Sequence, residues 1–175
     1  MRGDSAIDEA ALKREIREFL DSHHVVSLAT VADGAVHAAS LMFAVEDFSL
    51  IWISGPDARH SRAIDRNAQV AATVAPDYES FRRIRGLQIA GRAHRLGHAG
   101  EAAHAGELLR RRFQFLRELQ SAPAALRAAI DRAAYYRLDP DTITLIDNTR
   151  GFGNKHTLRI SWSITDRLSV LPSRS

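Results

Sequence analysis

Apolar side chains near the start of the chain recur at the spacing of an α-helix. Through Ala6 to Asp21 they fall every three or four residues, on one helical face: Leu12, Ile16, Phe19 and Leu20. From His24 onward β-branched and apolar residues alternate with small polar ones, which is the period of a β-strand. The pattern therefore predicts an amphipathic first helix that leads into a sheet.

Five β-rich segments follow between residues 24 and 96. Turn-forming residues separate them, of which Ala32-Asp33-Gly34 and Gly55-Pro56-Asp57 are the clearest. A short helix is expected over Asp57 to Asn67, between the third and fourth strands. The predicted strands are His24 to Val31, Ala35 to Val45, Ser49 to Ser54, Gln69 to Ala75 and Ile84 to Leu96. So many short strands in succession predict an antiparallel barrel.

The helical period returns beyond residue 96. One apolar face predicts a helix from about Ala99 to Leu119, and a second short helix follows Pro123 and ends at Asp131. Strand character resumes over Tyr135 to Asp147 and over Thr157 to Ile164. We therefore expect one domain over residues 1–175, mainly β, with six or seven antiparallel strands and helices packed outside. Its parts are the helix 6–21, a barrel core at about 24–96, a helical insertion at about 99–131 and C-terminal strands at about 135–164.

Composition narrows the class of protein. The 175 residues are 45% hydrophobic, which is enough for a real core, and the net charge of +3 is too small to favour nucleic-acid binding. Cysteine is absent, which excludes disulfides and thiolate chemistry and suits a reducing compartment. No apolar stretch reaches the length of a membrane span. We therefore expect a cytoplasmic protein with no membrane and no nucleic-acid partner.

The turn between the third predicted strand and the short helix carries the most informative chemistry. The helix opens with Arg59, His60 and Ser61, and its N-terminus favours anions through unpaired N–H groups and the helix dipole. Arginine offers a planar pair of donors to phosphate, and the hydroxyls of Ser54 and Ser61 add two more donors. These features predict an anion site. A helix merely capped by Ser54 or Asp57, with solvated arginines, is the alternative.

The same residues resemble a known family. Ser54, Arg59 and His60 are similar to the phosphate-gripping segment of the pyridoxamine 5'-phosphate oxidase-like, FMN-binding split-barrel superfamily. The order of elements around them is also similar, over roughly Val25 to Leu96. The motif Leu145 to Lys155 resembles one found in a bacterial branch of that superfamily. The implied fold is an antiparallel split β-barrel.

The resemblance implies a cofactor and a binding site. The cofactor would be FMN, with haem or deazaflavin as the alternatives that other branches of the superfamily bind. Its ring would lie over the second strand, against backbone groups, and its phosphate at the turn after the third strand. The implied cofactor-binding residues are Ser40, Leu41, Met42, Ile53, Ser54, Arg59, His60, Ser61 and Gln88. Redox chemistry would belong to the flavin, and the sequence identifies no catalytic residue and no metal site.

Three positions depart from the family pattern. In the alignment that the resemblance implies, pyridoxamine phosphate oxidases have an arginine at the position of Ala39 and a lysine at the position of Ala44. The glutamine that contacts flavin in those oxidases aligns with Gly86, and Gln88 on the same strand face is the candidate to replace it. The resemblance therefore implies a flavin-dependent oxidoreductase that acts on another small molecule. A haem- or deazaflavin-binding protein for sensing, storage or degradation, and a cofactor-free interaction domain, are the alternatives.

Superfamily members build their sites between two subunits, so the resemblance also implies a homodimer with sites at the subunit interface. The apolar strand Leu50 to Ile53 favours a partner as well, because both of its faces need cover. Trp52 fits either the core or a cofactor wall, and Phe152 and Lys155 fit either an interface or the flavin edge. The basic stripe on the long predicted helix is expected to be a solvated face, with Glu107 and Glu118 as partners: Arg110, Arg111, Arg112 and Arg117.

Overall fold

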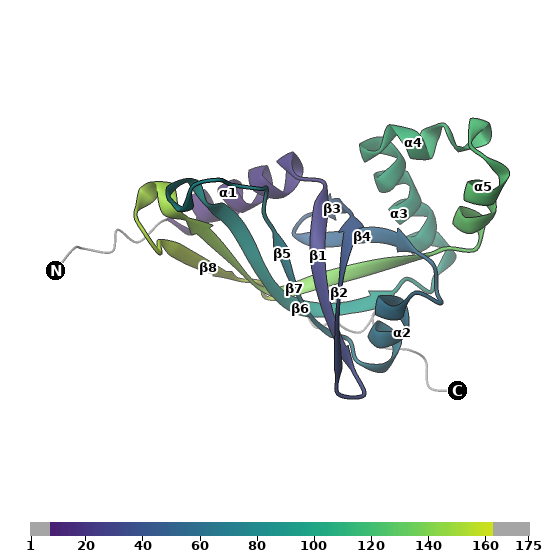
Figure 1. Ribbon diagram of the computed structural model, residues 1–175, viewed down its shortest axis with the longest axis horizontal. Helices are drawn as coiled ribbons and strands as arrows, with labels where there is room; N and C mark the ends of the chain where they lie inside the picture. The colour runs from purple at the N-terminus through teal and green to yellow at the C-terminus, as the bar shows by residue number, and fades with distance from the viewer. Residues whose placement is uncertain (1–7, 163–175) are drawn as a thin grey trace.

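A computed structural model describes residues 8–162. Figure 1 shows a curled sheet with helices placed separately around it. The helices are α1 (Glu9–Ser22), α2 (Arg59–Arg66), α3 (Ala99–Arg112), α4 (Gln114–Arg117) and α5 (Ala124–Asp131), with short 3-10 helices η1 (Phe81–Arg83), η2 (Leu119–Ser121) and η3 (Asn148–Arg150). The strands are β1 (Val25–Ala32), β2 (Ala35–Met42), β3 (Ala44–Glu46), β4 (Ser49–Ser54), β5 (Gln69–Val74), β6 (Arg85–Arg95), β7 (Ala134–Asp147) and β8 (Lys155–Arg159). No helix in this part of the chain is long and apolar enough to cross a membrane.

One bent strand closes the sheet into a split barrel. β2 pairs with β1, and beyond Phe43 the chain continues as β3, which pairs with β4. The hydrogen-bonded order β2-β1-β5-β6-β7-β4-β3 therefore begins and ends on the same stretch of chain, and β8 pairs with β7. The predicted antiparallel split barrel is confirmed. Residues 8–162 hold eight strands, where six or seven were expected, because the bend at Phe43 divides the second one.

Alternating side chains and α1 fill the barrel. The predicted apolar face of the first helix is buried as expected, and the helix runs from Glu9 to Ser22. The predicted hairpin is also present, since Asp33 and Gly34 have φ angles of 51° and 75°, which a two-residue type I′ turn requires. The last predicted strand lies earlier in the chain than expected, at Lys155–Arg159. Residues 6–7 of the predicted first helix and residues 163–164 of the predicted last strand fall outside the described residues.

The second face of β4 is covered by the chain itself. A second apolar cluster forms between β3, β4 and the helical segment, and its members are Ala44, Ile51, Ala105, Leu109, Phe113 and Leu116. Helices α3 and α4 therefore supply the cover that the sequence analysis expected from a partner subunit. The continuous helix expected from Ala99 to Leu119 was wrong. Phe113 leaves helical geometry (φ −119°, ψ 112°) and buries its ring in this cluster, so the helix breaks there.

The basic stripe of α3 is solvated only in part. Arg110 and Arg111 pair with Glu107 at 3.5 and 2.9 Å on the helix surface, as expected. Glu118 instead accepts a hydrogen bond from the Gln114 amide at 2.6 Å. The stripe is thus largely a set of local ion pairs and hydrogen bonds.

Arg112 is the exception in this stripe, because its side chain is half-buried against α1. Its Nη2 donates to the main-chain oxygens of Leu20 at 2.9 Å, Asp21 at 3.1 Å and His23 at 2.5 Å. These carbonyls belong to the C-terminal end of α1, whose own last turn contains no basic residue. Arg112 therefore satisfies carbonyl groups that the helix leaves without partners.

Candidate functional site

Helix α2 begins without a side-chain cap. β4 ends at Ser54, and the following turn leads to Ala58, which occupies the N-cap position and makes no side-chain hydrogen bond. Ala58 has no side-chain acceptor, and neither Ser54 nor Asp57 supplies one in its place. The N–H groups in the first turn of α2 thus lack a side-chain partner. The side-chain cap of the alternative interpretation is thus absent among the described residues, although Arg59 and Arg62 are exposed as that interpretation expected. The N–H donors of this turn are available to an anion.

His60 is buried beside the end of β4. Its Nε2 lies 2.8 Å from the Ser54 hydroxyl oxygen, and only 8% of the residue is exposed. Burial lowers the pKa of His60, and the neighbouring His37 lowers it further. The imidazole is therefore neutral near pH 7 and acts as the partner of the Ser54 hydroxyl. The fixed positive charge of this segment comes instead from the exposed Arg59.

Ser61 lies in the first turn of α2 and is 0% exposed. Its hydroxyl oxygen has no hydrogen-bond partner among the described residues. Leaving a buried hydroxyl unpaired costs about 1–3 kcal/mol, so such groups are uncommon in folded proteins. A buried, unpaired hydroxyl next to uncapped N–H groups is therefore the feature of this segment that points most directly to a ligand.

The bent strand places a free backbone edge near this segment. Within residues 8–162 β2 pairs only with β1, so alternate N–H and C=O groups of β2 point away from its partner. The side chains of Ser40 and Met42 are exposed on the outer face, whereas Leu41 packs against the core. β2 and β4 approach each other, which brings the predicted β2 residues towards Ile53 and Ser54. Ile53 itself packs against the α3 cluster.

Gln88 is the predicted site residue that the structure sets apart. It is exposed on β6, on the same outer face of the sheet as Ser40. A ladder of paired residues runs between them, from Ser40 through Ser27 and Thr73 to Gln88. Three strand spacings separate the ends of this ladder by about 14 Å. Gln88 therefore shares a face with the β2 residues but lies three strands away from Ser40.

A groove between α2 and the β1–β2 turn joins the predicted Arg59 to residues that the sequence analysis did not assign to a site. Arg59, Arg62 and Arg66 line it from the helix, and Asp33 and His37 line it from the hairpin. The spacing of three and four residues between the arginines could have indicated one basic helix face. The approach of the hairpin, however, arises only in the folded barrel.

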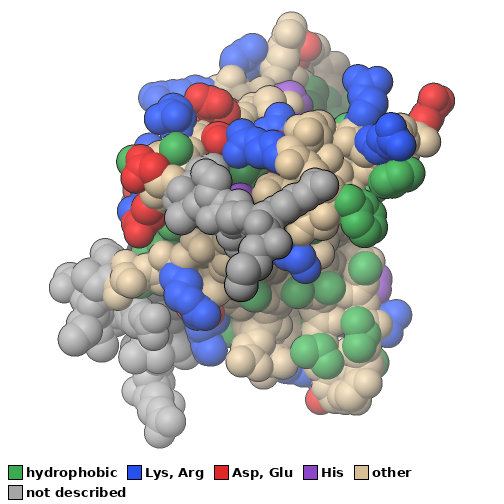
Figure 2. Space-filling model, turned by 90° about the vertical axis from the view of Figure 1, so that its left-hand side faces the viewer, with side chains coloured by type: hydrophobic (Ala, Val, Ile, Leu, Met, Phe, Trp, Pro, Cys, Tyr) green, Lys and Arg blue, Asp and Glu red, His purple; other side chains and the backbone are tan. Residues whose placement is uncertain are grey.

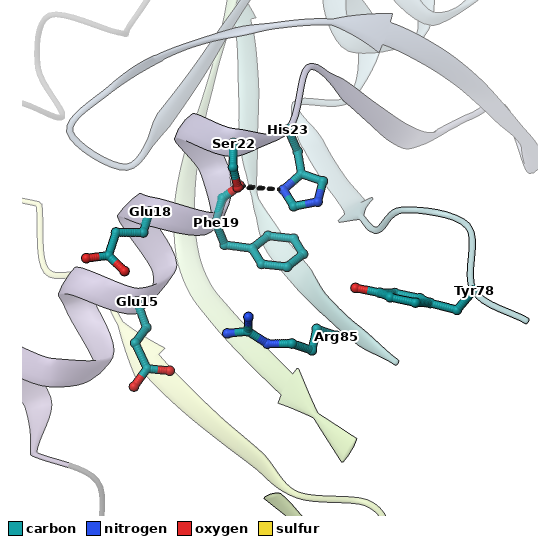
Figure 3. Close-up of a pocket in the computed structure, with 7 residues that line it drawn as sticks. All are labelled: Glu15, Glu18, Phe19, Ser22, His23, Tyr78 and Arg85. Atoms are coloured by element: carbon teal, nitrogen blue, oxygen red, sulfur yellow. Dashed lines mark hydrogen bonds between the residues drawn. The ribbon is translucent and has the colours of Figure 1, made fainter. Parts of the chain in front are cut away.

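A second pocket lies between α1, the loop after β5 and the start of β6 (Figure 3). The rings of Phe19 and His23 stack with centroids 4.0 Å apart, and the Arg85 guanidinium lies 5.9 Å from the Phe19 centroid. Tyr78 points its hydroxyl towards this group (Figure 3). Arg85 is paired with the buried Asp147 at 3.1 Å, so the charged group in the middle of the pocket already has a partner. The sequence analysis assigned none of these residues to a site.

The remaining candidate aromatic residues lie away from α2. Trp52 belongs to the core, where its ring stacks on Tyr136 with centroids 5.8 Å apart. Phe152 is exposed and meets Phe81 edge-on at 5.9 Å. β8, which begins at Lys155, and α2 are well separated along the long axis of the molecule (Figure 1). Within one chain, Phe152 and Lys155 therefore do not join the anion site.

Known proteins share both the sequence pattern and the fold. The family model of pyridoxamine 5'-phosphate oxidase matches residues 12–147. The UPF0306 protein YhbP of Salmonella paratyphi A is 31% identical over 150 residues, covering 83% of this chain and 92% of that protein. The region matched by the family model, residues 12–147, includes α2 and all strands from β1 to β7.

Solved structures show the same fold at lower identity. The conserved hypothetical protein Rv2991 from Mycobacterium tuberculosis has a TM-score of 0.67 at 19% identity, covering 93% of this chain and 98% of its own. A heme binding protein from Mycobacterium smegmatis has a TM-score of 0.64 at 18% identity, covering 84% of this chain and 57% of its own. With the family match over most of its length, the chain belongs to the pyridoxamine 5'-phosphate oxidase-like split-barrel family.

Proposed function

We propose that this chain is a flavoprotein that binds FMN, with the phosphate at the start of α2. The observation that carries the proposal is the buried hydroxyl of Ser61, which has no partner among the described residues. It lies in a helical turn whose N–H groups lack a side-chain cap, beside the exposed guanidinium of Arg59. This donor set fits a phosphate dianion, because it combines backbone N–H groups, a hydroxyl and a charged planar fork. Neutral His60 would orient the Ser54 hydroxyl.

The flavin ring would lie along the free edge of β2. Backbone groups at Ser40, Leu41 and Met42 would supply donors and acceptors to its polar rim, as alternate groups on an unpaired strand edge do. When bound, the flavin supplies the redox chemistry, exchanging hydride or electrons with a small molecule and a donor. The chain's own residues would bind and orient the ring and limit the approach of water. Gln88 would reach the ring only from across the sheet face.

The substrate would not be pyridoxamine phosphate. This chain has Ala39 and Ala44 at the positions where the oxidases have basic residues. Ala44 is also buried beneath α3, with 3% of the residue exposed, so this position offers no charged side chain to a ligand. Loss of two charge-assisted contacts would cost about 1.5–3 kcal/mol each. We expect no appreciable oxidation of pyridoxamine phosphate by the flavin-loaded protein. Turnover near the median enzyme rate of about 10 s⁻¹ would contradict this expectation.

We further propose a twofold homodimer. The outer face of β1, β2, β5 and β6 consists mainly of exposed small side chains, among them Ser27, Ala38, Ser40, Ala71, Thr73 and Ala90. Exposed Val25, Val36 and Met42 add apolar area to this face. A sheet face of this kind can pack closely on a copy of itself, and Ser40 would then lie at the interface. Light scattering at micromolar concentration should give a dimer, and Ala71→Arg should give a monomer. A monomeric wild type would refute the proposal.

The absorption spectrum of the purified protein tests the cofactor. Oxidised flavin has a two-band visible spectrum, whereas haem has an intense Soret band and deazaflavin a single band at shorter wavelength. Because cofactor can be lost during purification, the apoprotein should also be titrated with FMN by fluorescence quenching. Saturable FMN binding by the wild type supports the proposal. A Soret band, or haem binding without FMN binding, would favour the haem alternative suggested by the M. smegmatis protein's name.

A further inference from the structure

The pocket beside α1 is separate from the proposed flavin site. It lies against the second half of α1 and the start of β6, whereas the flavin phosphate is proposed at α2, and the two helices are well separated in Figure 1. The volume of the pocket is about 190 Å³. Because a cavity of about 150 Å³ can hold a molecule the size of benzene, this pocket has room for a small molecule but not for a nucleotide.

Arg85 brings unused hydrogen-bond donors to this pocket. Its buried Nε lies 3.1 Å from the Asp147 carboxylate but makes no hydrogen bond, so the contact is an ion pair alone. Within residues 8–162 none of the N–H groups of Arg85 donates a hydrogen bond. Figure 3 shows the guanidinium below the Phe19 ring, on the side that faces α1. A guanidinium whose two Nη groups are free is well suited to hold a carboxylate through two hydrogen bonds.

The charges around Arg85 disfavour a simple anion. Arg85 is balanced by Asp147, and Arg150 is balanced by Glu15 at 2.8 Å. Glu18, one turn along α1 from Glu15, is exposed and pairs with no basic side chain among the described residues. The pocket therefore carries one uncompensated negative charge. A ligand with only a carboxylate would be repelled by this charge, and a ligand with only an amine would leave the Arg85 donors without an acceptor.

The remaining wall of the pocket is aromatic. The rings of Phe19 and His23 are stacked, and the His23 Nδ1 lies 2.7 Å from the Phe19 carbonyl oxygen. A carbonyl only accepts, so Nδ1 carries the proton, and Nε2 of the neutral ring is an acceptor. The Tyr78 hydroxyl, which points into the pocket in Figure 3, makes no hydrogen bond within the described residues. The pocket thus combines free donors, free acceptors and apolar ring surface.

We infer that this pocket binds a small zwitterion, an α-amino acid with an apolar side chain. The carboxylate of the ligand accepts from the Nη groups of Arg85 and from the Tyr78 hydroxyl. Its ammonium group donates to Glu18 and neutralises the uncompensated charge, and its side chain lies against the aromatic wall. Acidic and basic side chains are interspersed over the face at the left of Figure 1 (Figure 2), so groups within the pocket, and not a broad field of one sign, select the ligand.

Three matched ligands test this site by isothermal titration calorimetry of the flavin-free full chain. Leucine carries both charges, isocaproate is leucine without the ammonium group, and isopentylamine is leucine without the carboxylate. Each charge-assisted contact contributes about tenfold to affinity, so leucine should bind at least about tenfold more tightly than either analogue. Equal binding of leucine and either analogue, or no saturable binding of leucine up to about 10 mM, would overturn the assignment. Failure of the chain to bind flavin would leave this test unaffected.

Single variants locate the binding. Glu18→Gln should weaken leucine about tenfold without weakening isocaproate, and Tyr78→Phe should weaken leucine about fivefold. Neither side chain makes a hydrogen bond or ion pair within the described residues, so both variants should fold normally, which circular dichroism checks.

Arg85→Lys keeps a positive charge beside Asp147 but removes the planar pair of donors, and should weaken leucine about tenfold. If this variant does not fold, the Glu18 and Tyr78 variants still decide the matter. Glu79→Gln is the matched control, because Glu79 is exposed next to Tyr78 but does not line the pocket, and it should leave the affinity unchanged. Leucine binding that none of the three pocket substitutions weakens would place the ligand elsewhere and refute the site.

Discussion

Ser61→Ala should change ligand-free stability and FMN affinity in opposite directions. The hydroxyl of Ser61 is fully buried and has no hydrogen-bond partner among the described residues. A buried hydroxyl left unpaired costs about 1–3 kcal/mol. Replacing it with a methyl hydrogen removes this cost and leaves almost the same volume. We expect the free energy of unfolding without ligand to stay level or rise by up to about 1 kcal/mol. A gain of that size corresponds to about 2–4 °C in the thermal midpoint of a domain of this length.

The same substitution should weaken FMN binding. A neutral hydrogen bond contributes about 1 kcal/mol, so the dissociation constant should rise about fivefold. Urea denaturation of the apoprotein measures the stability, and quenching of FMN fluorescence measures the affinity. A hydroxyl with only a structural role would affect stability and leave affinity unchanged.

Ser49→Ala is the matched control, because Ser49 is also 0% exposed but has its partners within the chain. Its hydroxyl donates to the Asp139 carboxylate at 2.6 Å and accepts from Arg137 at 3.0 Å. Removing it should lower the free energy of unfolding by about 1.5–3 kcal/mol, as expected for a hydrogen bond to a charged group, and leave FMN affinity unchanged. If Ser61→Ala destabilises the apoprotein as much as Ser49→Ala and binds FMN normally, the phosphate site at α2 is wrong.

Four further predictions concern charge, pH and packing. Arg59→Ala should weaken FMN binding about ten- to a hundredfold in the same titration, and equal affinities for the two proteins would place the phosphate elsewhere. Burial lowers the pKa values of His60 and His94, so below about pH 6.5 the unfolded chain binds more protons than the folded chain. The free energy of unfolding should therefore fall as the pH falls through this range. Urea denaturation at several pH values measures this free energy, and a level profile would contradict the burial argument. FMN affinity should stay level between about pH 7 and 8, because His60 remains neutral there. Gly91→Ala should lower the free energy of unfolding by about 1–3 kcal/mol, because the added Cβ would collide with the backbone of β7. Gly100→Ala is the control: its Cβ would meet open space, so the free energy of unfolding should stay level or rise in the same denaturation assay.

The strands were predictable because their signals are local. Period-two alternation and turn residues such as Asp33-Gly34 identified every strand except the short β3. The division at Phe43 was not predictable, since the bend arises when one strand must pair with β1 on one side and with β4 on the other. The break at Phe113 had the same origin, because the apolar period continues through it and only the tertiary pocket draws the ring inward.

The candidate site could be predicted only in part. The turn after β4 carries its own signal, and Ser54, Arg59, His60 and Ser61 do lie together there. His37 was missed because it enters from a strand more than twenty residues earlier in the sequence, and its approach depends on how the hairpin curls over α2. The neutral state of His60 could not be read from the sequence either, since it follows from burial.

The hydrogen bonds of Arg112 bear on how the molecule folds. They connect residues about ninety positions apart in the chain, so they can form only after a long loop has closed. We therefore expect the last turn of α1 to acquire these partners late in folding, together with the covering of β4. Amide protons at the end of α1 should exchange with solvent in step with those of β4. The helical segment at residues 99–131 therefore belongs to the cooperative unit of the barrel, and a shortened chain without it would lose both an apolar cover and the support of its first helix.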